Sequence, residues 1–94
     1  MFEIRRNGSR RVSMSGRFNA SHVERARDVF SSVSGTCTVD FTELEYISSA
    51  GLSVLLETQQ RLGGTGHELV LTGLSRHLTD LFRIAGFDRI FKIR

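Results

Sequence analysis

Hydrophobic residues along the chain recur with two spacings, one typical of strands and one typical of helices. Two extended runs, at 2–6 and 10–15, flank Asn7-Gly8. This pair is typical of a tight hairpin turn in which both residues take positive φ. Helical spacing then appears three times, and each stripe predicts a helix with one buried face. The stripes are Val23, Ala26, Phe30 and Val33; Leu52, Leu55, Leu56 and Leu62; and Leu74, Leu78, Leu81, Phe82 and Ala85.

Three short apolar runs predict the remaining strands, at 36–41, 68–72 and 89–93. Ser75 is expected to cap the third helix and Gly86 to end it in the left-handed conformation, with Phe87 touching Phe82. The order ββαβαβαβ predicts an α/β fold, with helices packed on a mostly parallel sheet and an antiparallel N-terminal edge strand. The length of 94 residues fits a single domain, 1–94.

Composition adds little except at the N-terminus. Hydrophobic residues make up 39% and charged residues 24%, an ordinary globular balance. The first 17 residues carry five arginines and one glutamate, whereas the rest of the chain has a net charge of −1. Such a run either contacts nucleic acid or another acidic surface, or guards a solvated strand edge. It has no interleaved aromatic residues and no recognition helix, so we favour the edge and expect no nucleic-acid partner.

The sequence lacks the motifs of most catalytic and ligand-binding sites. The single cysteine, Cys37, excludes an internal disulfide and lies in a predicted buried strand. The three histidines lack metal-ligand spacing. The glycine-rich segment 63–66 follows a helix and lacks the phosphate-loop lysine, and no nucleophile elbow is present. We therefore expect no metal, no cofactor, no catalytic residue and no enzymatic activity.

Location follows from what the chain does not contain. No apolar run approaches the roughly 20 residues of a membrane helix, and no signal segment follows Met1. Nothing requires an oxidising compartment. We expect a cytoplasmic protein without membrane insertion.

The remaining candidate is Ser48-Ser49-Ala50-Gly51-Leu52, at the start of the second predicted helix. The first turn of a helix has unpaired N–H groups and a partial positive charge. A serine there either caps the helix or holds a phosphate that the helix N-terminus stabilises, and spacing alone does not choose. The acidic residues Asp40, Glu43 and Glu45 precede it, either as a solvated loop or as an acidic rim on the site.

Three motifs in order resemble the STAS domain, the family of anti-sigma factor antagonists. Val39-Asp40-Phe41 followed by Glu45-Tyr46-Ile47-Ser48-Ser49-Ala50-Gly51-Leu52 is similar to the family's central strand, loop and helix start. The segment 15–19 resembles its Gly-Arg-Leu-Asp start of the first helix, and 85–91 resembles its C-terminal ending. The resemblance covers nearly the whole chain and implies a STAS-like fold.

The resemblance also implies a site and partners. It places the family's regulatory phosphoserine on Ser49, and Asn19 and Ser48 where the family has aspartates. Asn19, Ser48, Ser49, Ala50, Gly51 and Leu52 would then form the partner-binding surface. The implied partners are an anti-sigma factor that is also a serine protein kinase, and a serine phosphatase. Phosphorylation of Ser49 would switch binding off.

An alternative keeps the fold but removes the switch. The chain ends at Arg94, directly after the last predicted strand, where many antagonists have a further helix. Short members of the family also occur as soluble subunits of lipid-transporting ABC systems. In such a constitutive subunit, or in a scaffold of a signalling complex, Ser49 would be only a helix cap and a contact.

Overall fold

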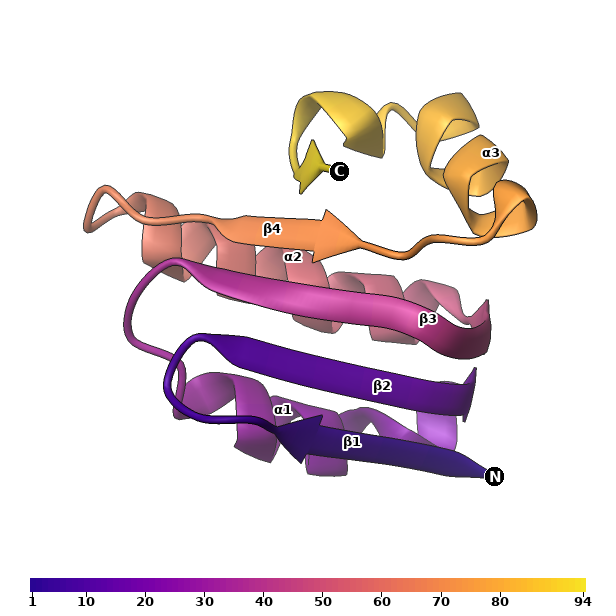
Figure 1. Ribbon diagram of the computed structural model, residues 1–94, viewed down its shortest axis with the longest axis horizontal. Helices are drawn as coiled ribbons and strands as arrows, with labels where there is room; N and C mark the ends of the chain where they lie inside the picture. Colours follow the sequence, from indigo (N-terminus) through magenta and orange to yellow (C-terminus); the bar gives the residue numbers. More distant parts are fainter.

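The computed structural model describes residues 1–94 as one five-stranded sheet with helices on one face (Figure 1). The strands lie side by side in chain order, β1 antiparallel to β2 and all later pairs parallel. This confirms the predicted α/β class, the antiparallel edge strand and the element order. The strands are β1 (Phe2–Arg6), β2 (Arg11–Phe18), β3 (Cys37–Ile47), β4 (Leu69–Thr72) and β5 (Lys92–Ile93). The helices are α1 (Val23–Ser31), α2 (Ser49–Gly63) and α3 (Arg76–Ile84), with 3₁₀ turns η1 (Ala20–His22) and η2 (Phe87–Arg89).

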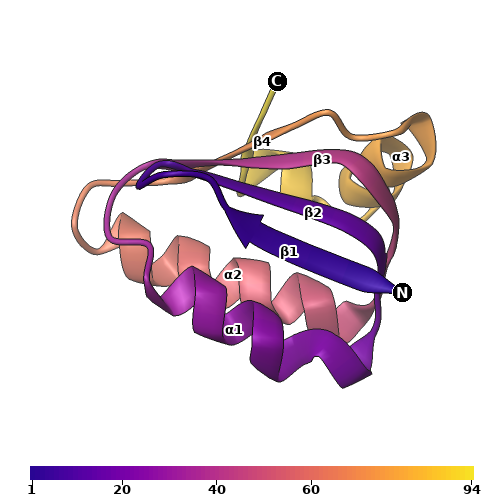
Figure 2. The same cartoon turned by 60° about the horizontal axis from the view of Figure 1, so that its bottom comes forward.

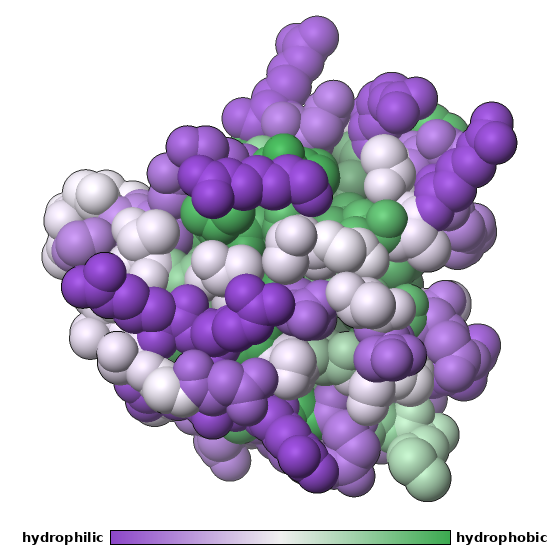
Figure 3. All heavy atoms as spheres, in the orientation of Figure 1, coloured by the Kyte–Doolittle hydropathy of each residue, from purple (hydrophilic) through white to green (hydrophobic).

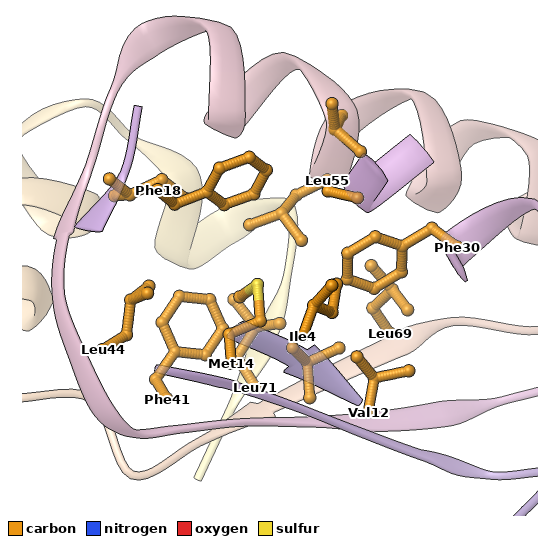
Figure 4. Close-up of a cluster of buried hydrophobic side chains, with 14 of the residues drawn as sticks. Ile4, Val12, Met14, Phe18, Phe30, Phe41, Leu44, Leu55, Leu69 and Leu71 are labelled. Carbon is orange, nitrogen blue, oxygen red and sulfur yellow. The ribbon is translucent and has the colours of Figure 1, made fainter. Parts of the chain in front are cut away.

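The hydrophobic core fills the space between the sheet and the helices (Figures 2 and 4). Side chains alternate between the two faces of a strand, so every second residue of β1 and β2 faces α1 and α2. In Figure 4 the strand residues Val12 and Phe41 point toward Leu55 of α2 and Phe30 of α1. All four are at most 1% exposed. The opposite face of the sheet has no helix on it (Figure 2).

An arginine of α2 joins this helix to the end of α1. Arg61 of α2 donates hydrogen bonds to the carbonyls of Phe30 and Val33, each at 2.8 Å. The Phe30 carbonyl also accepts the N–H of Val33 at 3.0 Å, so Arg61 adds a second donor to it just after α1 ends. The hydrophobic spacing predicts Val33 on this helix. In the structure α1 ends at Ser31, and Val33 lies beyond it but is fully buried.

The third helix is built as the sequence predicts. The Ser75 side chain accepts the N–H of Leu78 at 3.2 Å, and Gly86 follows the helix with φ of 79°. Phe87 then packs edge-on against Phe82, with ring centroids 5.9 Å apart. Phe82 also contacts Phe41 of β3 edge-on at 5.9 Å, which seats α3 on the core.

The hairpin between β1 and β2 forms, but its turn is not the expected one. Asn7 does not take positive φ; of the turn residues only Gly8 does, at 79°. The N–H of Asn7 donates to the carbonyl of Arg11 at 2.7 Å, so three residues lie between these two. The two-residue turn with Asn7 and Gly8 at its centre is therefore wrong. The local pair correctly located the reversal of the chain but not the loop length.

Strand β3 is longer than the predicted strand at 36–41, because the chain stays extended through 42–47. Two register shifts against β2 each insert an extra residue into β3. Buried positions are therefore spaced by two up to Phe41 and then by three, at Leu44 and Ile47. The alternation that identifies a strand breaks at this point, which explains the error. Asp40, Glu43 and Glu45 thus lie on a strand that leads directly to the serines.

The last strand is shorter than the predicted 89–93. Residues up to Arg89 form the turn η2, and only Lys92 and Ile93 pair with β4. Phe91 between them is buried against Phe82 and Phe87, with ring centroids 6.1 and 6.3 Å away. Packing of the aromatic cluster therefore bends the chain where the alternating pattern alone predicted extension.

We expect Gly8→Ala to destabilise the protein by about 1 kcal/mol. Gly8 has φ of 79°, and a Cβ there would meet no atom within 4 Å, so the effect is purely conformational. The matched control is Gly35→Ala, which is equally uncrowded but has no positive φ. Urea denaturation of the two variants measures the difference. Equal stability of both would contradict the turn geometry.

The carboxylate of Asp40 ties the first register shift of β3 in place. Its Oδ1 accepts the backbone N–H of Thr42 at 2.9 Å and the hydroxyl of Thr42 at 2.6 Å, and its Oδ2 lies 3.2 Å from Arg11. The hydrogen bonds from Thr42, followed by the Arg11 guanidinium, hold the pKa of Asp40 below its usual value. A lowered folded-state pKa gives stability that is present above the unfolded value, near 3.9, and lost as pH falls through the folded value.

We therefore expect acid to destabilise the wild type more than Asp40→Asn. The free energy of unfolding of the wild type should fall more steeply below about pH 4. At neutral pH the variant should be the less stable of the two. Denaturant titrations from pH 7 to pH 2 on both proteins give the comparison, since all other carboxylates are shared. Parallel curves would show that this carboxylate contributes no pH dependence.

Candidate functional site

The candidate site lies where β2 and β3 end at their C-termini and α2 begins. The backbone N–H of Ser48 donates to the carbonyl of Phe18 at 2.9 Å, which ties the residue after β3 to the last residue of β2. Asn19 directly follows Phe18. The structure therefore brings Asn19 together with 48–52, although 28 residues separate Asn19 from Ser48 in the sequence.

The two serines at this site have different roles. Ser48 is extended, and its Oγ accepts the N–H of Gly51 at 3.1 Å, so Ser48 is the N-cap of α2. Ser49 is the first residue of the helix, and its side chain is exposed. The reading of Ser49 as the helix cap is therefore wrong, because the cap falls one residue earlier. The hydroxyl of Ser49 accordingly makes no capping bond.

Glycine at position 51 allows the start of α2 to pack closely on the sheet. A Cβ on Gly51 would lie 3.0 Å from Cγ1 of Ile47 and 3.1 Å from Cγ of Phe18. The first turn of α2 thus rests directly on the last side chains of β3 and β2. Gly51 is buried and offers no side chain to a partner, so it acts by letting the helix approach the sheet.

The remaining predicted residues lie around Ser49 with unequal exposure. Ala50 is half-buried, and Leu52 is half-buried and packs against the core. Asn19 is also half-buried: its Oδ1 accepts the N–H of Ser21 at 3.2 Å and the hydroxyl of Ser21 at 2.6 Å, and so begins η1. Among the six predicted residues, Ser49 is the one with an exposed side chain.

The electrostatic character of the site comes from the helix itself. The first turn of α2 contains no acidic residue. Its first N–H groups point out of the helix start and, with the helix dipole, give a partial positive charge. A negative group on Ser49 would be favourable at this position within the folded chain.

Two residues beside the site were not singled out from the sequence. Arg17 of β2 and Tyr46 of β3 are register partners, and the guanidinium carbon of Arg17 lies 4.4 Å from the centroid of the Tyr46 ring. Their pairing depends on the second register shift of β3. No sequence signal reveals that shift, although alternation along β2 does place Arg17 on the face opposite Phe18.

Comparisons with known proteins agree with this fold. The family model described as "Mlab, STAS domain" matches residues 2–93. This chain belongs to the STAS domain family. The family model covers all five strands, so the predicted resemblance is confirmed over nearly the whole chain.

Relatives of this STAS domain are named as antagonists of anti-sigma factors. An anti-sigma-B factor antagonist of Listeria monocytogenes is 36% identical over 78 residues, which is 82% of this chain and 68% of the relative. BtrV of Bordetella bronchiseptica, named as an anti-sigma factor antagonist, is 44% identical over 55 residues. That alignment spans 58% of this chain and less than half of BtrV, 47%. These names describe regulatory proteins rather than enzymes.

The STAS fold itself is shared with the Bacillus cell fate determinant SpoIIAA, solved in its phosphorylated form. The TM-score is 0.71 at 19% identity, with 100% of this chain and 91% of that chain covered. At this identity the likeness concerns the fold. No helix of this STAS domain combines the length and apolar character needed to cross a bilayer.

Substitutions of the two serines should have unequal effects on stability. Ser48→Ala removes the N-cap of α2 and should destabilise the protein by about 1 kcal/mol. Ser49→Ala removes an exposed hydroxyl and should change stability by no more than about 0.5 kcal/mol. Thermal and urea unfolding of the two variants measure both effects. A larger loss for Ser49→Ala would mean that α2 begins one residue later.

Proposed function

We propose that this STAS domain is an anti-sigma factor antagonist switched by phosphorylation of Ser49. In the unmodified state, the surface formed by Asn19 and 48–52 binds an anti-sigma factor that is also a serine protein kinase. The kinase transfers the γ-phosphoryl group of ATP to the Ser49 hydroxyl, with loss of the hydroxyl proton and release of ADP. A serine phosphatase restores the free hydroxyl. All three proteins would meet in the cytoplasm.

The exposed hydroxyl of Ser49 beside a capping Ser48 is the observation that carries the proposal. Because Ser48 supplies the bond to Gly51, Ser49 is free for chemistry without loss of the cap. Its exposed side chain at the first helical position is within reach of a docked enzyme. The fold therefore supports a modification at Ser49 that leaves α2 intact.

The charge of a phosphate explains how such a modification would switch binding without a change of fold. A phosphoserine carries about −1.5 to −2 charges at neutral pH. The start of α2 stabilises this charge within the chain. Against a partner, the same charge must be desolvated or meets like charge, which costs several kcal/mol. At about 1.4 kcal/mol per decade, the affinity would fall by two or more orders of magnitude.

The names of the relatives support the class of partner. The Listeria monocytogenes relative and BtrV are both named as anti-sigma factor antagonists. The name of the Listeria protein specifies sigma B for that protein alone. The partner proposed for this chain is therefore an anti-sigma factor, without a particular sigma factor.

A second candidate function follows from the family model, whose description is "Mlab" rather than antagonist. In this case the chain would be a constitutive STAS subunit of a lipid-transporting ABC system, bound to its ATPase. The surface around Ser49 would then be a permanent contact without phosphorylation. Neighbouring genes separate the two candidates: a kinase and a phosphatase favour the switch, and a permease and an ATPase favour the subunit.

Phosphorylation at Ser49 is the direct test. The purified chain is incubated with ATP and, in turn, with each anti-sigma-type serine kinase encoded in the genome that encodes this chain. We expect one kinase to add a single phosphate to Ser49, located by mass spectrometry of the peptide. Ser49→Ala should bind that kinase without being modified, and Ser48→Ala should still be modified at Ser49. Phosphate on Ser48 instead would mean that the family's phosphoserine has been placed one residue too late in this sequence.

Binding of charged variants tests the switch separately. Ser49→Asp should fold, because a carboxylate is favourable at a helix start. It should bind the kinase about tenfold or more weakly by calorimetry, since it carries part of the phosphate charge. The control is Ser34→Asp, the same change at an exposed loop residue before β3, at the opposite end of that strand. If the affinity of Ser49→Asp is unchanged and the wild type carries no phosphate, the constitutive subunit would be the remaining candidate function.

A further inference from the structure

An open groove lies on the helix-free face of the sheet, over the second half of β2 and the adjacent part of β3. Figure 3 views this face, where pale small polar side chains form a band among charged ones. The groove is lined by Met1, Ser15, Gly16, Arg17, Glu43 and Glu45. The small residues Ser15 and Gly16 of β2 line it, and the backbone of Met1 packs directly against Gly16.

Arg17 is held in this groove by an aromatic ring rather than by a carboxylate. Its guanidinium carbon lies 4.4 Å from the Tyr46 ring centroid. The five ion pairs of the fold use other residues, and no side-chain hydrogen bond involves Arg17. A guanidinium stacked on a ring keeps its N–H groups free at its edge, with its orientation already fixed.

The groove lies next to the site around Ser49 along two paired strands. Arg17 precedes Phe18 and Asn19 in β2, and Tyr46 precedes Ile47 and Ser48 in β3. The next register pair after Arg17 and Tyr46 is Phe18 with Ile47. The N–H of Ser48, which follows Ile47, donates to the Phe18 carbonyl. A partner docked on Ser49 would therefore extend over Arg17 if it covers the open face.

We propose that Arg17, positioned by Tyr46, binds a carboxylate side chain of the same protein partner that docks at Ser49. This inference rests on the proposed function and adds the chemistry by which the partner is recognised. The planar guanidinium presents paired N–H donors that match the two oxygens of a carboxylate. Arg17 is the recognition residue and Tyr46 is the positioning residue.

Glu43 and Glu45 on the other side of the groove add selectivity. Both are exposed and form no ion pair in the fold. They repel any acidic group that enters the groove, and the paired donors of Arg17 attract one, so a carboxylate is favoured only where it meets the guanidinium directly. Repulsion of wrong alignments contributes to specificity alongside the attractive contact.

Calorimetric binding of the kinase found by the phosphorylation experiment tests this inference. Arg17→Glu should weaken binding at least tenfold, and Arg17→Lys about threefold, because lysine keeps the charge but loses the paired donors. Tyr46→Leu should also weaken binding, whereas Tyr46→Phe, which keeps the ring, should bind as the wild type does. The matched control is Arg10→Glu, an exposed arginine in the hairpin loop that should change affinity less than twofold.

A second measurement locates the contact directly. In NMR spectra of the wild type, the Nε–Hε signal of Arg17 should shift on addition of the kinase, and that of Arg10 should not. Circular dichroism establishes that each variant is folded. If Arg17→Glu misfolds, the affinities of Arg17→Lys and the wild type are compared instead. Equal affinities of these two proteins would then overturn the carboxylate contact.

The outcomes separate this inference from the function on which it rests. Equal affinities of wild type and Arg17→Glu, with Ser49 still phosphorylated, would overturn the carboxylate contact alone. Equal losses for Arg17→Glu and Arg10→Glu would do the same, because they would indicate a general charge effect. If the wild type binds none of the kinases, the proposed function and the carboxylate contact both fail.

Discussion

The arrangement of the candidate site depends on the contact between Gly51 and the ends of two strands. The first turn of α2 rests on Phe18 and Ile47, so closely that a single methyl group at position 51 would have to displace them. Phe18 is itself fixed by stacking on Phe2 of β1, with ring centroids 4.6 Å apart. The start of α2 is thereby anchored to three strands of the sheet. Ser48 and Ser49 take their different orientations from that anchor.

This anchor links core packing to the proposed regulation. Because the start of α2 packs closely on Phe18 and Ile47, a phosphate on Ser49 would act on the interface rather than displace the helix. The helix dipole and the free N–H groups favour the added charge inside the chain, while a docked partner must desolvate it. The proposed switch is therefore electrostatic and local. It requires no second conformation of the fold.

The sheet contributes a second surface through its two unequal faces. One face is covered by helices and holds the core, and the other remains open (Figure 2). The register shifts in β3 determine which of its residues reach the open face near the site, and they pair Tyr46 with Arg17. Without them, strict alternation from Phe41 would place Glu43 and Glu45 on the buried face and Leu44 on the open one. The shifts thus keep the apolar residues inside and set an aromatic ring beneath the arginine.

The sequence by itself determined the element order, the sheet class, the helix stripes, the caps at Ser75 and Gly86, and the family, because these follow from local spacing and from motifs. It located the hairpin but not its loop, and it identified the segment 48–52 without distinguishing Ser48 from Ser49 as the cap. Only the tertiary structure decided the length of β3, the shortness of β5 and the pairing of Arg17 with Tyr46. Each of these depends on contacts between residues distant in the chain: the register of β3 on β2, the packing of Phe91 on Phe82, and the seat of Gly51 on Phe18. Local patterns carry no information on such contacts, since the cross-strand neighbour of a residue is fixed only when the sheet has assembled.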